Sequence, residues 1–361
     1  MKKIDIVVGA RPNYIKAFPV YEALNKTGNF DLRLINTGQH YDDNMSNIFF
    51  RQLGMKKPDV DLSVGSDSHA VQTAKIMIKI EKEFLRKKPD LLIVFGDVNS
   101  TIAAALTATK LNIPIAHIEA GLRSFDRSMP EEVNRILTDQ ISTYLFTTSP
   151  EAEKNLLLEG KIKKQIYFVG NTMIDSLVKF EKLFNCSDLL IENKLIKKEY
   201  ILVTLHRPSN VDNPSKLKDV ANSLNMISEK TEIIWPIHPR TWGKLNQYKI
   251  LLNERINITK PKGYLEFMGL QKNAKFIITD SGGVQEESTY FGIPCFTVRD
   301  NTERPITVNR GSNILVGSDF TKLFDVIIEC GKKEKRRNLL PEKWDGASSE
   351  RIASIIINNI L

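Results

Sequence analysis

The sequence predicts an α/β protein built from two doubly wound, parallel-sheet domains. Short runs rich in β-branched residues alternate with longer segments of helical periodicity along most of the chain. Several runs, among them Leu91–Phe95, are apolar throughout, which is typical of strands that helices cover on both faces. Such an alternation indicates right-handed βαβ units. The predicted strands form two series, first Ile4–Gly9, Leu32–Asn36, Leu91–Phe95, Ile113–Ile118, Tyr144–Thr147 and Ile166–Val169, then Tyr200–Leu205, Ile233–Ile237, Ile256–Thr259, Phe276–Thr279, Cys295–Val298 and Asn313–Val316.

The break between the two series predicts the domain organisation. The chain has 361 residues, enough for two domains with full cores. We expect a first domain over residues 1–170 and a second over residues 171–345. A last helix is predicted from about Ser348, within residues 346–361, and its pattern alone allows packing on either domain.

The charge of the chain indicates which classes of binding partner to expect. Lys and Arg number 51 against 43 Asp and Glu, so the formal net charge is +8, which suits an anionic small molecule. Lysine pairs are scattered, and the densest basic run, Lys332–Arg337, has no aromatic residues interleaved with it. We interpret that run as a solvated helix face and predict no nucleic-acid partner.

The cysteine, histidine and hydropathy patterns indicate which classes of protein the chain does not resemble: disulfide-bonded, metal-binding, secreted and membrane proteins. The three cysteines are far apart, and the five histidines lack metal-ligand spacing, so we predict neither a disulfide framework nor a metal site. His40 and His69 have no partner in sequence. The segment Met1–Asp5 is too short and too charged for a signal peptide, and no apolar run is long enough to span a membrane. We therefore expect a cytoplasmic protein with no membrane partner.

The loop after the first strand carries two cations. Doubly wound sheets bind ligands beyond the carboxyl ends of their strands. Pro12 is suited to the first helical position, and Arg11 and Lys16 then lie at the positive end of a helix, which attracts anions. A tight turn with two surface cations is the equally weighted alternative. Neither a dinucleotide fingerprint nor a P-loop is present, so we predict no nucleotide cofactor.

Acidic residues follow the next strands of the first series. Asp97 comes just after Leu91–Phe95, where it acts either as a helix N-cap or as a base. Glu119 ends an apolar strand, where a carboxylate is costly unless it is paired or functional. Glu131 lies in the first turn of a helix and Arg135 follows four residues later, so an ion pair between them is the alternative to a functional role. Three carboxylates on neighbouring loops suit proton transfer on two faces of a substrate.

The second series carries groups that suit a diphosphate. His206 and Arg207 lie just past a strand, and His238 recurs after the next one. Ser281, Gly282 and Gly283 connect a strand to a helix and expose backbone N–H groups, which predicts a phosphate cradle. Glu287, one turn inside that helix, is placed to hold ribose hydroxyls.

These segments together resemble the non-hydrolysing UDP-N-acetylglucosamine 2-epimerase family. The match is collinear from Gly9 to Arg304. The motifs that carry it are Gly-Ala-Arg-Pro with Lys16, Thr37-Gly38-Gln39-His40, Gly96-Asp97, His117 to Arg123, Pro130-Glu131-Glu132 with Asn134-Arg135, His206-Arg207, Asp280 to Gly283 with Glu286-Glu287, and Thr302 to Pro305.

The resemblance implies a fold, a reaction and a set of site residues. It implies a GT-B-like pair of Rossmann-like domains facing a cleft, with the last helix on the first domain. UDP-GlcNAc and UDP-ManNAc would interconvert by elimination of UDP to a 2-acetamidoglucal and its re-addition, without a cofactor, for surface polysaccharide precursors. The resemblance makes Asp97, Glu119 and Glu131 the proton-handling acids and Arg135 their orienting residue. It places His206 in the catalytic set, Arg11, Lys16, His206, Ser281, Gly282 and Gly283 at the diphosphate, Glu287 at the ribose, and Gly263 and Tyr264 at the uracil.

The sequence leaves alternatives open for both the substrate and the function. The substrate can instead be a UDP-sugar with a second acetamido group at C3 or a carboxylate at C6, and a hydrolysing 2-epimerase is a close competitor. More remote are a glycosyltransferase on the same scaffold and a non-catalytic nucleotide-sugar-binding regulator. The resemblance also implies a homodimer.

Overall fold

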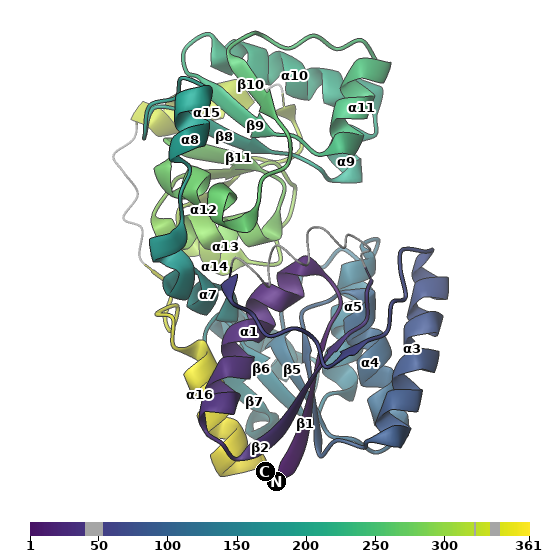
Figure 1. Ribbon diagram of the computed structural model, residues 1–361. Coiled ribbons are helices and arrows are strands. Elements are labelled where there is room, and N and C mark those ends of the chain that lie inside the picture. Colours follow the sequence, from purple (N-terminus) through teal and green to yellow (C-terminus); the bar gives the residue numbers. More distant parts are fainter. Residues whose placement is uncertain (40–52, 321–322, 333–339) are drawn as a thin grey trace. The chain divides into compact units, whose positions relative to one another are not determined.

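The computed structural model describes residues 1–39, 53–320, 323–332 and 340–361. His40 and residues 333–337 of the basic run lie outside the described residues. The chain divides into two compact units, one of Met1–Lys179 with Glu342–Leu361 and one of Phe180–Pro341 (Figure 1). The helices that the structure describes include none that is long and apolar enough to cross a membrane.

The first unit is a doubly wound parallel sheet. Its strand order is β3-β2-β1-β4-β5-β6-β7, and every paired strand runs parallel to its neighbour. The strands are β1 (Lys2–Val8), β2 (Phe30–Asn36), β3 (Val60–Asp61), β4 (Leu91–Phe95), β5 (Ile115–Ala120), β6 (Tyr144–Thr147) and β7 (Ile166–Phe168). The helices are α1 (Arg11–Lys26), α3 (His69–Arg86), α4 (Asn99–Lys110), α5 (Pro130–Ile141), α6 (Pro150–Leu158), α7 (Thr172–Phe180) and α16 (Ser348–Ile355).

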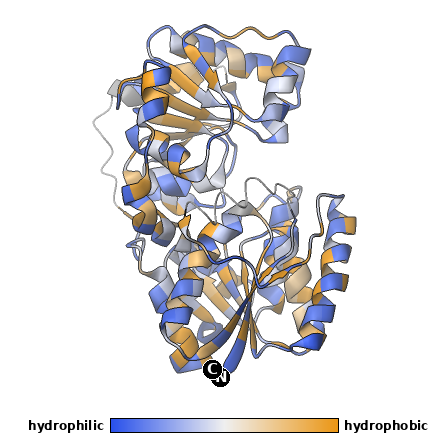
Figure 2. Ribbon diagram, in the orientation of Figure 1, coloured by the Kyte–Doolittle hydropathy of each residue, from blue (hydrophilic) through white to orange (hydrophobic). Residues whose placement is uncertain are grey.

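Two hydrophobic clusters cover the two faces of this sheet. One packs Val20 of α1 and Ile352 of α16 against strands β1 and β4, and the other packs Phe84 of α3 and Ala105 of α4 against the opposite face. The apolar strands between these helix layers are visible in Figure 2. This two-sided cover explains why Leu91–Phe95 is apolar at every position.

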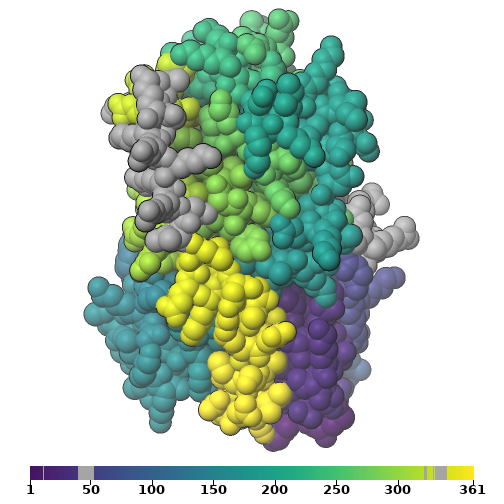
Figure 3. Space-filling view, turned by 90° about the vertical axis from the view of Figure 1, so that its left-hand side faces the viewer, coloured from purple at the N-terminus to yellow at the C-terminus, as the bar shows by residue number. Residues whose placement is uncertain are grey.

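The last helix belongs to the first unit. Helix α16 packs along α1 (Figure 3). The Asp175 carboxylate accepts hydrogen bonds from the N–H groups of Ser348 (3.1 Å) and Ser349 (2.6 Å), which caps the start of the helix. Trp344 is fully buried just before it, and its indole N–H donates to the Thr148 carbonyl at 3.0 Å.

The second unit repeats the doubly wound plan with one strand fewer. Its order is β10-β9-β8-β11-β12-β13, again parallel throughout. The strands are β8 (Ile201–Thr204), β9 (Ile233–Pro236), β10 (Ile256–Thr259), β11 (Phe276–Thr279), β12 (Cys295–Thr297) and β13 (Asn313–Leu315). The helices are α8 (Ser187–Glu192), α9 (Pro208–Val211), α10 (Pro214–Ser228), α11 (Pro239–Gln247), α12 (Tyr264–Asn273), α13 (Gly282–Phe291), α14 (Pro305–Asn309) and α15 (Leu323–Lys332).

Each sheet has a point where the strand order reverses. In the first sheet it lies between β1 and β4, and in the second between β8 and β11. Loops that follow strands on either side of such a point diverge and leave room for a ligand. The segments after β1 and β4 contain Lys16 and Asp97, and those after β8 and β11 contain His206 and Ser281.

Candidate functional site

Glu119 occupies an unusual backbone position in β5. We expected it at the end of the strand, but β5 continues to Ala120, and the register with β6 shifts around Glu119. Its φ of 74° lies in the left-handed region, which non-glycine residues adopt rarely and at a cost in free energy. The bulge turns the carboxylate towards Lys16 of α1, with which it forms an ion pair. Lys16 and Glu119 are 8% and 5% exposed, so Lys16 is not the surface cation of the alternative interpretation.

The start of α1 is tied to the neighbouring strand. The helix begins at Arg11, one residue before the position predicted from Pro12. The side chain of Asn13 accepts a hydrogen bond from the Ala10 N–H (3.1 Å) and donates one to the Phe95 carbonyl (3.1 Å). Asn13 therefore anchors the helix that carries Lys16 to the end of β4. The side chain of Arg11 lies outside the described part of the structure.

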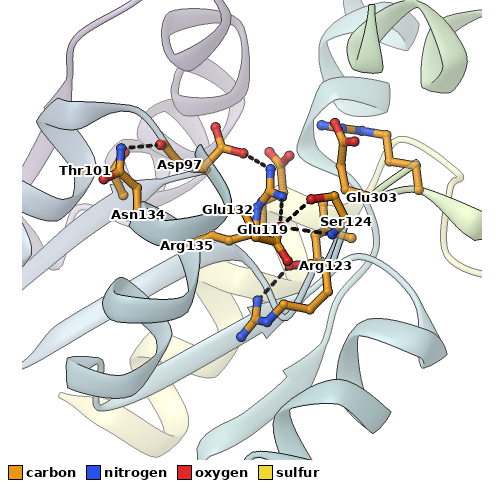
Figure 4. A network of polar contacts seen from close by, with 12 residues as sticks. Asp97, Thr101, Glu119, Arg123, Ser124, Glu132, Asn134, Arg135 and Glu303 are labelled. Atoms are coloured by element: carbon orange, nitrogen blue, oxygen red, sulfur yellow. Dashed lines mark hydrogen bonds and ion pairs between the residues drawn. The ribbon is translucent and has the colours of Figure 1, made fainter. Parts of the chain in front are cut away.

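Asp97 is paired with a buried arginine. The N-cap of α4 is Val98, which has no side-chain oxygen, so the N-cap interpretation of Asp97 is wrong. The Asp97 carboxylate instead forms an ion pair with Arg135 of α5 (Figure 4). Its backbone carbonyl accepts a hydrogen bond from the Asn134 amide at 2.9 Å. Helix α5 thus contacts both the side chain and the main chain of Asp97.

Arg135 pairs with Glu132 rather than with Glu131. The predicted ion pair between Glu131 and Arg135 is wrong, because Glu131 is exposed while Glu132, one residue on, turns inwards. Glu132 is fully buried, and its carboxylate also accepts hydrogen bonds from Ser124 N, Ser124 Oγ and Phe125 N, each at 2.9 Å. The sequence offers adjacent glutamates after Pro130, and helical periodicity alone did not identify which one is buried.

A second buried network lies behind these acids, and sequence reasoning gave its members no role. His117 of β5 contacts Asp139 of α5 and the carbonyl of Gly96, and Asp139 also contacts Arg123. All three side chains are almost completely buried. The only sequence signal was a histidine and an arginine on either side of Glu119 in one short motif.

In the second unit, Asp280 organises the segment after β8. This carboxylate is fully buried and lies at the end of β11. It accepts hydrogen bonds from the N–H groups of His206 and Arg207 and from the Asn210 amide, and it lies 3.0 Å from His206 Nδ1. Burial acts to raise the pKa of Asp280, but these hydrogen bonds and the His206 charge outweigh it and lower the pKa. His206 itself is about half exposed, with Asp280 fixing its orientation.

The predicted phosphate cradle is the N-terminus of α13. The helix begins at Gly282, with Ser281 as the N-cap. The first N–H groups of an α-helix have no intrahelical acceptor and carry the positive end of its dipole, so they favour an anion. A Cβ at Gly282 would lie 2.5 Å from Arg304 Nη1 and 2.7 Å from Glu303 Oε1, whereas at Gly283 it would meet nothing within 4 Å. Gly282 thus lets the helix lie directly over a buried ion pair.

The ion pair of Arg304 and Glu303 is part of a larger buried network. In the sequence these residues appeared only within the motif Thr302 to Pro305 and had no predicted role. Arg304 pairs with Glu303 and, through Nε at 2.8 Å, with Glu286 of α13. Glu303 also lies 2.9 Å from Arg299 Nη2. Two guanidinium groups and two carboxylates therefore lie together beneath the start of α13.

Glu287 and Tyr264 lie on neighbouring helices. Glu287 is buried and accepts a hydrogen bond from the Gln271 amide of α12 at 2.5 Å. Tyr264 begins α12, directly after the N-cap Gly263. Burial, and then the Glu287 charge, raise the pKa of Tyr264 well above its ordinary value. The residues predicted to bind the ribose and the uracil thus lie on two neighbouring helices of the second unit, α12 and α13.

Two further histidines in the described part of the chain, His69 and His238, have local partners. His69 contacts the side-chain amide of Asn99, and the His238 Nδ1 accepts from the Arg240 N–H at the start of α11. Within residues 1–39, 53–320, 323–332 and 340–361, no three His, Cys, Asp or Glu side chains are grouped as a metal site would require.

Comparison with known proteins agrees with the motifs. The family model described as UDP-N-acetylglucosamine 2-epimerase matches residues 22–357. The chain is 46% identical to the UDP-N-acetylglucosamine 2-epimerase of Methanocaldococcus jannaschii, over 98% of this chain and 98% of the relative. It is 40% identical to the UDP-2,3-diacetamido-2,3-dideoxy-D-glucuronate 2-epimerase of Pseudomonas aeruginosa, over 98% of this chain and 99% of the relative.

A solved structure is similar over the same range. It is that of the M. jannaschii UDP-GlcNAc 2-epimerase in complex with UDP-GlcNAc and UDP, with a TM-score of 0.89 and 44% identity over 98% of this chain and 99% of that one. The GT-B-like fold class expected from the sequence is confirmed. The chain belongs to the UDP-N-acetylglucosamine 2-epimerase family.

Proposed function

We propose that this protein interconverts UDP-GlcNAc and UDP-ManNAc by inverting carbon 2 of the sugar. The observation that carries the proposal is the pair of carboxylates at adjacent strand ends, Glu119 in a left-handed bulge beside Lys16 and Asp97 beside Arg135. The substrate class rests on family membership and on the M. jannaschii relative, whose solved structure contains UDP-GlcNAc and UDP.

The chemistry requires an elimination, because the C2 proton of the sugar is not acidic enough for direct removal. In the proposed reaction the bond between C1 and the diphosphate oxygen breaks, and UDP leaves with the electron pair. A carboxylate accepts the C2 proton, which gives 2-acetamidoglucal. Re-addition forms the C1–O bond again while an acid delivers a proton to the other face of C2. Atoms and electrons balance without an oxidant, a reductant or water.

We assign the proton transfers to Asp97, Glu119 and Glu131. Lys16 and Arg135 give Glu119 and Asp97 fixed positions, as a base and an acid on two faces of one carbon require. Glu131 is exposed at the start of α5, where a carboxylate is accessible to a substrate. Arg135 acts by orienting Asp97.

We assign UDP binding mainly to the second unit. The N–H groups of Gly282 and Gly283, with Ser281 and His206, suit the diphosphate, because they combine a helix N-terminus with a histidine fixed by Asp280. In the proposal Arg11 and Lys16 add positive charge, Glu287 binds the ribose, and Gly263 and Tyr264 lie at the uracil.

Chromatography of the reaction products tests this function. Incubation with UDP-GlcNAc alone should give UDP-ManNAc with no free UDP, since re-addition restores the nucleotide sugar. Accumulation of UDP and free ManNAc would indicate a hydrolysing enzyme, and turnover only with an added acceptor would indicate a glycosyltransferase. Both outcomes contradict the proposal.

A modified UDP-sugar is the second candidate substrate. The observation that favours it is the 40% identity to the P. aeruginosa relative named for a 2,3-diacetamido glucuronate. Turnover of the diacetamido uronate but not of UDP-GlcNAc, in the same assay, would favour this candidate.

We further propose that the protein acts as a homodimer, which light scattering would test. We also propose that its product is a precursor of surface polysaccharides.

A further inference from the structure

The side-chain amide of Gln271 in α12 forms a buried hydrogen bond with Glu287 of α13. The nitrogen Nε2 lies 2.5 Å from Glu287 Oε2, and the two residues are 16 positions apart in the chain. An amide nitrogen only donates and a carboxylate oxygen accepts, so Gln271 is the donor. Gln271 has no exposed surface, whereas Glu287 is 7% exposed. Of the two side chains, Glu287 is therefore the one that a ligand can reach.

The other end of the same amide makes no hydrogen bond. Gln271 Oε1 is buried and has no hydrogen-bond partner among the residues that the structure describes. The amide nitrogen makes a second, weak contact with Met268 Sδ at 3.7 Å. An unsatisfied buried oxygen costs free energy, and an apolar side chain of similar length avoids that cost. The amide is thus unfavourable for the fold at one end, and its gain lies in the contact with Glu287.

Helical periodicity places this contact beside the predicted nucleotide site. Glu287 follows Gly283 by four residues, so both lie on one face of α13, about 6 Å apart along the helix axis. In α12 the buried residues Tyr264, Met268 and Gln271 also share one face. A ribose is joined to its diphosphate through the 5′ carbon. A diphosphate at the start of α13 and a carboxyl group one turn further on therefore suit the two parts of one nucleotide.

We propose that Gln271 is a positioning residue that holds Glu287 towards the 2′- and 3′-hydroxyls of the ribose and so sets the preference for ribonucleotides. The inference rests on the proposed binding of UDP, in which Glu287 contacts the ribose. A glutamate side chain loses rotamer freedom when it binds a ligand. A hydrogen bond that fixes it beforehand removes part of this cost and increases affinity. Gln271 acts only through Glu287, because it is itself fully buried.

Calorimetric titration with two nucleotides tests this role. UDP and 2′,3′-dideoxyuridine diphosphate differ only in the two hydroxyls, so the ratio of their Kd values measures ribose recognition. The wild type should bind UDP more tightly, because a site that hydrogen-bonds hydroxyls rejects an analogue without them. Gln271→Met keeps the length of the side chain and removes the donor. We expect its Kd for UDP to rise about tenfold, as for the loss of one hydrogen bond, with the Kd for the dideoxy nucleotide unchanged.

Two further variants show which step of the argument fails. Asn273→Leu is the matched control, because it removes an amide from the same helix that donates to the Gly269 carbonyl (2.8 Å). Its Kd ratio should equal that of the wild type. Glu287→Leu should lower the ratio, and an unchanged ratio there would overturn the ribose assignment together with the inference. A lowered ratio in Glu287→Leu with an unchanged ratio in Gln271→Met would overturn the inference alone.

Kinetics with UDP-GlcNAc separate positioning from a general structural role. Gln271→Met should raise KM and leave kcat for C2 exchange unchanged, which is the signature of lost binding that ground state and transition state share. Equal weakening of both nucleotides, or a lower kcat at unchanged KM, would contradict the inference. If Gln271→Met does not fold, Gln271→Asn withdraws the donor by one methylene and should lower the Kd ratio in the same way. The ratio does not depend on turnover, so a wild type that fails to epimerise UDP-GlcNAc would contradict only the proposed reaction.

Discussion

Lys16 Nζ and the Glu119 carboxylate form an ion pair in which each side chain is more than nine-tenths buried. Both charges are withdrawn from water, and the glutamate also adopts a left-handed backbone conformation. Desolvation and strain each cost free energy, so neither feature is expected at a position that only supports the fold. Strained, buried and charged residues are concentrated at functional sites.

The first prediction concerns Glu119→Gln. The amide preserves the size of the side chain but cannot accept a proton, so deuterium exchange at C2 should fall by roughly 10²–10⁴-fold. Binding of UDP, measured by calorimetry, should persist because the diphosphate groups assigned to the second unit, at the start of α13 and at His206, are unchanged. Full exchange activity in this variant would show that Glu119 is not a proton-handling group.

Glu119→Gln should also lower the free energy of unfolding. Lys16 then remains buried without its partner charge, which costs about 3 kcal/mol. The matched control is Glu153→Gln, which breaks the ion pair of Glu153 with the exposed Lys163 and should cost at most about 1 kcal/mol. Denaturant titration measures both losses in the free energy of unfolding. Equal losses in the two variants would show that the ion pair of Lys16 and Glu119 contributes no more to stability than an exposed ion pair.

The second prediction separates the adjacent glutamates of α5. Glu132→Gln should destabilise the protein by about 1–3 kcal/mol, because Glu132 accepts hydrogen bonds from Ser124 and Phe125 and pairs with Arg135. Glu131→Gln should leave stability within about 0.5 kcal/mol, since the side chain is exposed. Its effect on C2 exchange tests the assignment of Glu131 directly, because a stable variant with normal exchange would remove that residue from the catalytic set.

The third prediction compares two neighbouring glycines. Gly282→Ala introduces a methyl group 2.5 Å from Arg304 Nη1 and should disturb the buried pair of Arg304 and Glu303, lowering both thermal stability and UDP affinity. Gly283→Ala meets no protein atom and replaces a glycine inside a helix, so stability should stay the same or rise by up to about 1 kcal/mol. Weaker UDP binding by the second variant would support a diphosphate next to Gly283. Normal UDP binding in both variants would contradict the cradle.

The fourth prediction is a pH dependence. The folded state lowers the pKa of Asp280 from its ordinary value of 3.8, so the carboxylate contributes stability that is complete above that value. This stability is lost as the pH falls through the lower folded pKa. Asp280→Asn should therefore be destabilised relative to the wild type at neutral pH, and the difference in melting temperature should shrink below about pH 4. A difference that stays constant over this range would show that the charge of Asp280 contributes nothing.

The strands were predictable because burial on both faces leaves a direct trace in the sequence. Leu91–Phe95 and Phe276–Thr279 were identified to the residue, since each is an uninterrupted apolar or β-branched run. The pair Val60–Asp61 was missed, because an edge strand of two residues has too few positions for any pattern. Prolines marked helix starts well, as at Pro130, but left an uncertainty of one residue at Pro12.

The site was less predictable wherever tertiary contacts select between equivalent neighbours. Adjacent glutamates at positions 131 and 132 are alike in sequence, and only the arrangement of α5 against the Ser124 loop decides which is buried. The sequence left Asp97 open between an N-cap and a base, because an N-cap is the usual role of aspartate at such a turn and its pairing with Arg135 spans 38 residues. The bulge at Glu119 has no local signature, since nothing in the sequence marks a glutamate with positive φ.

The central claim is that carboxylates of the first unit move the C2 proton of a UDP-sugar. Incubation with UDP-GlcNAc in heavy water, followed by NMR, tests it most directly. We predict deuterium at C2 in a mixture of gluco and manno nucleotide sugars, at a rate that falls with Glu119→Gln. Appearance of the manno epimer with the original hydrogen still at C2, or no deuterium incorporation with UDP-GlcNAc or its diacetamido uronate analogue, would contradict it.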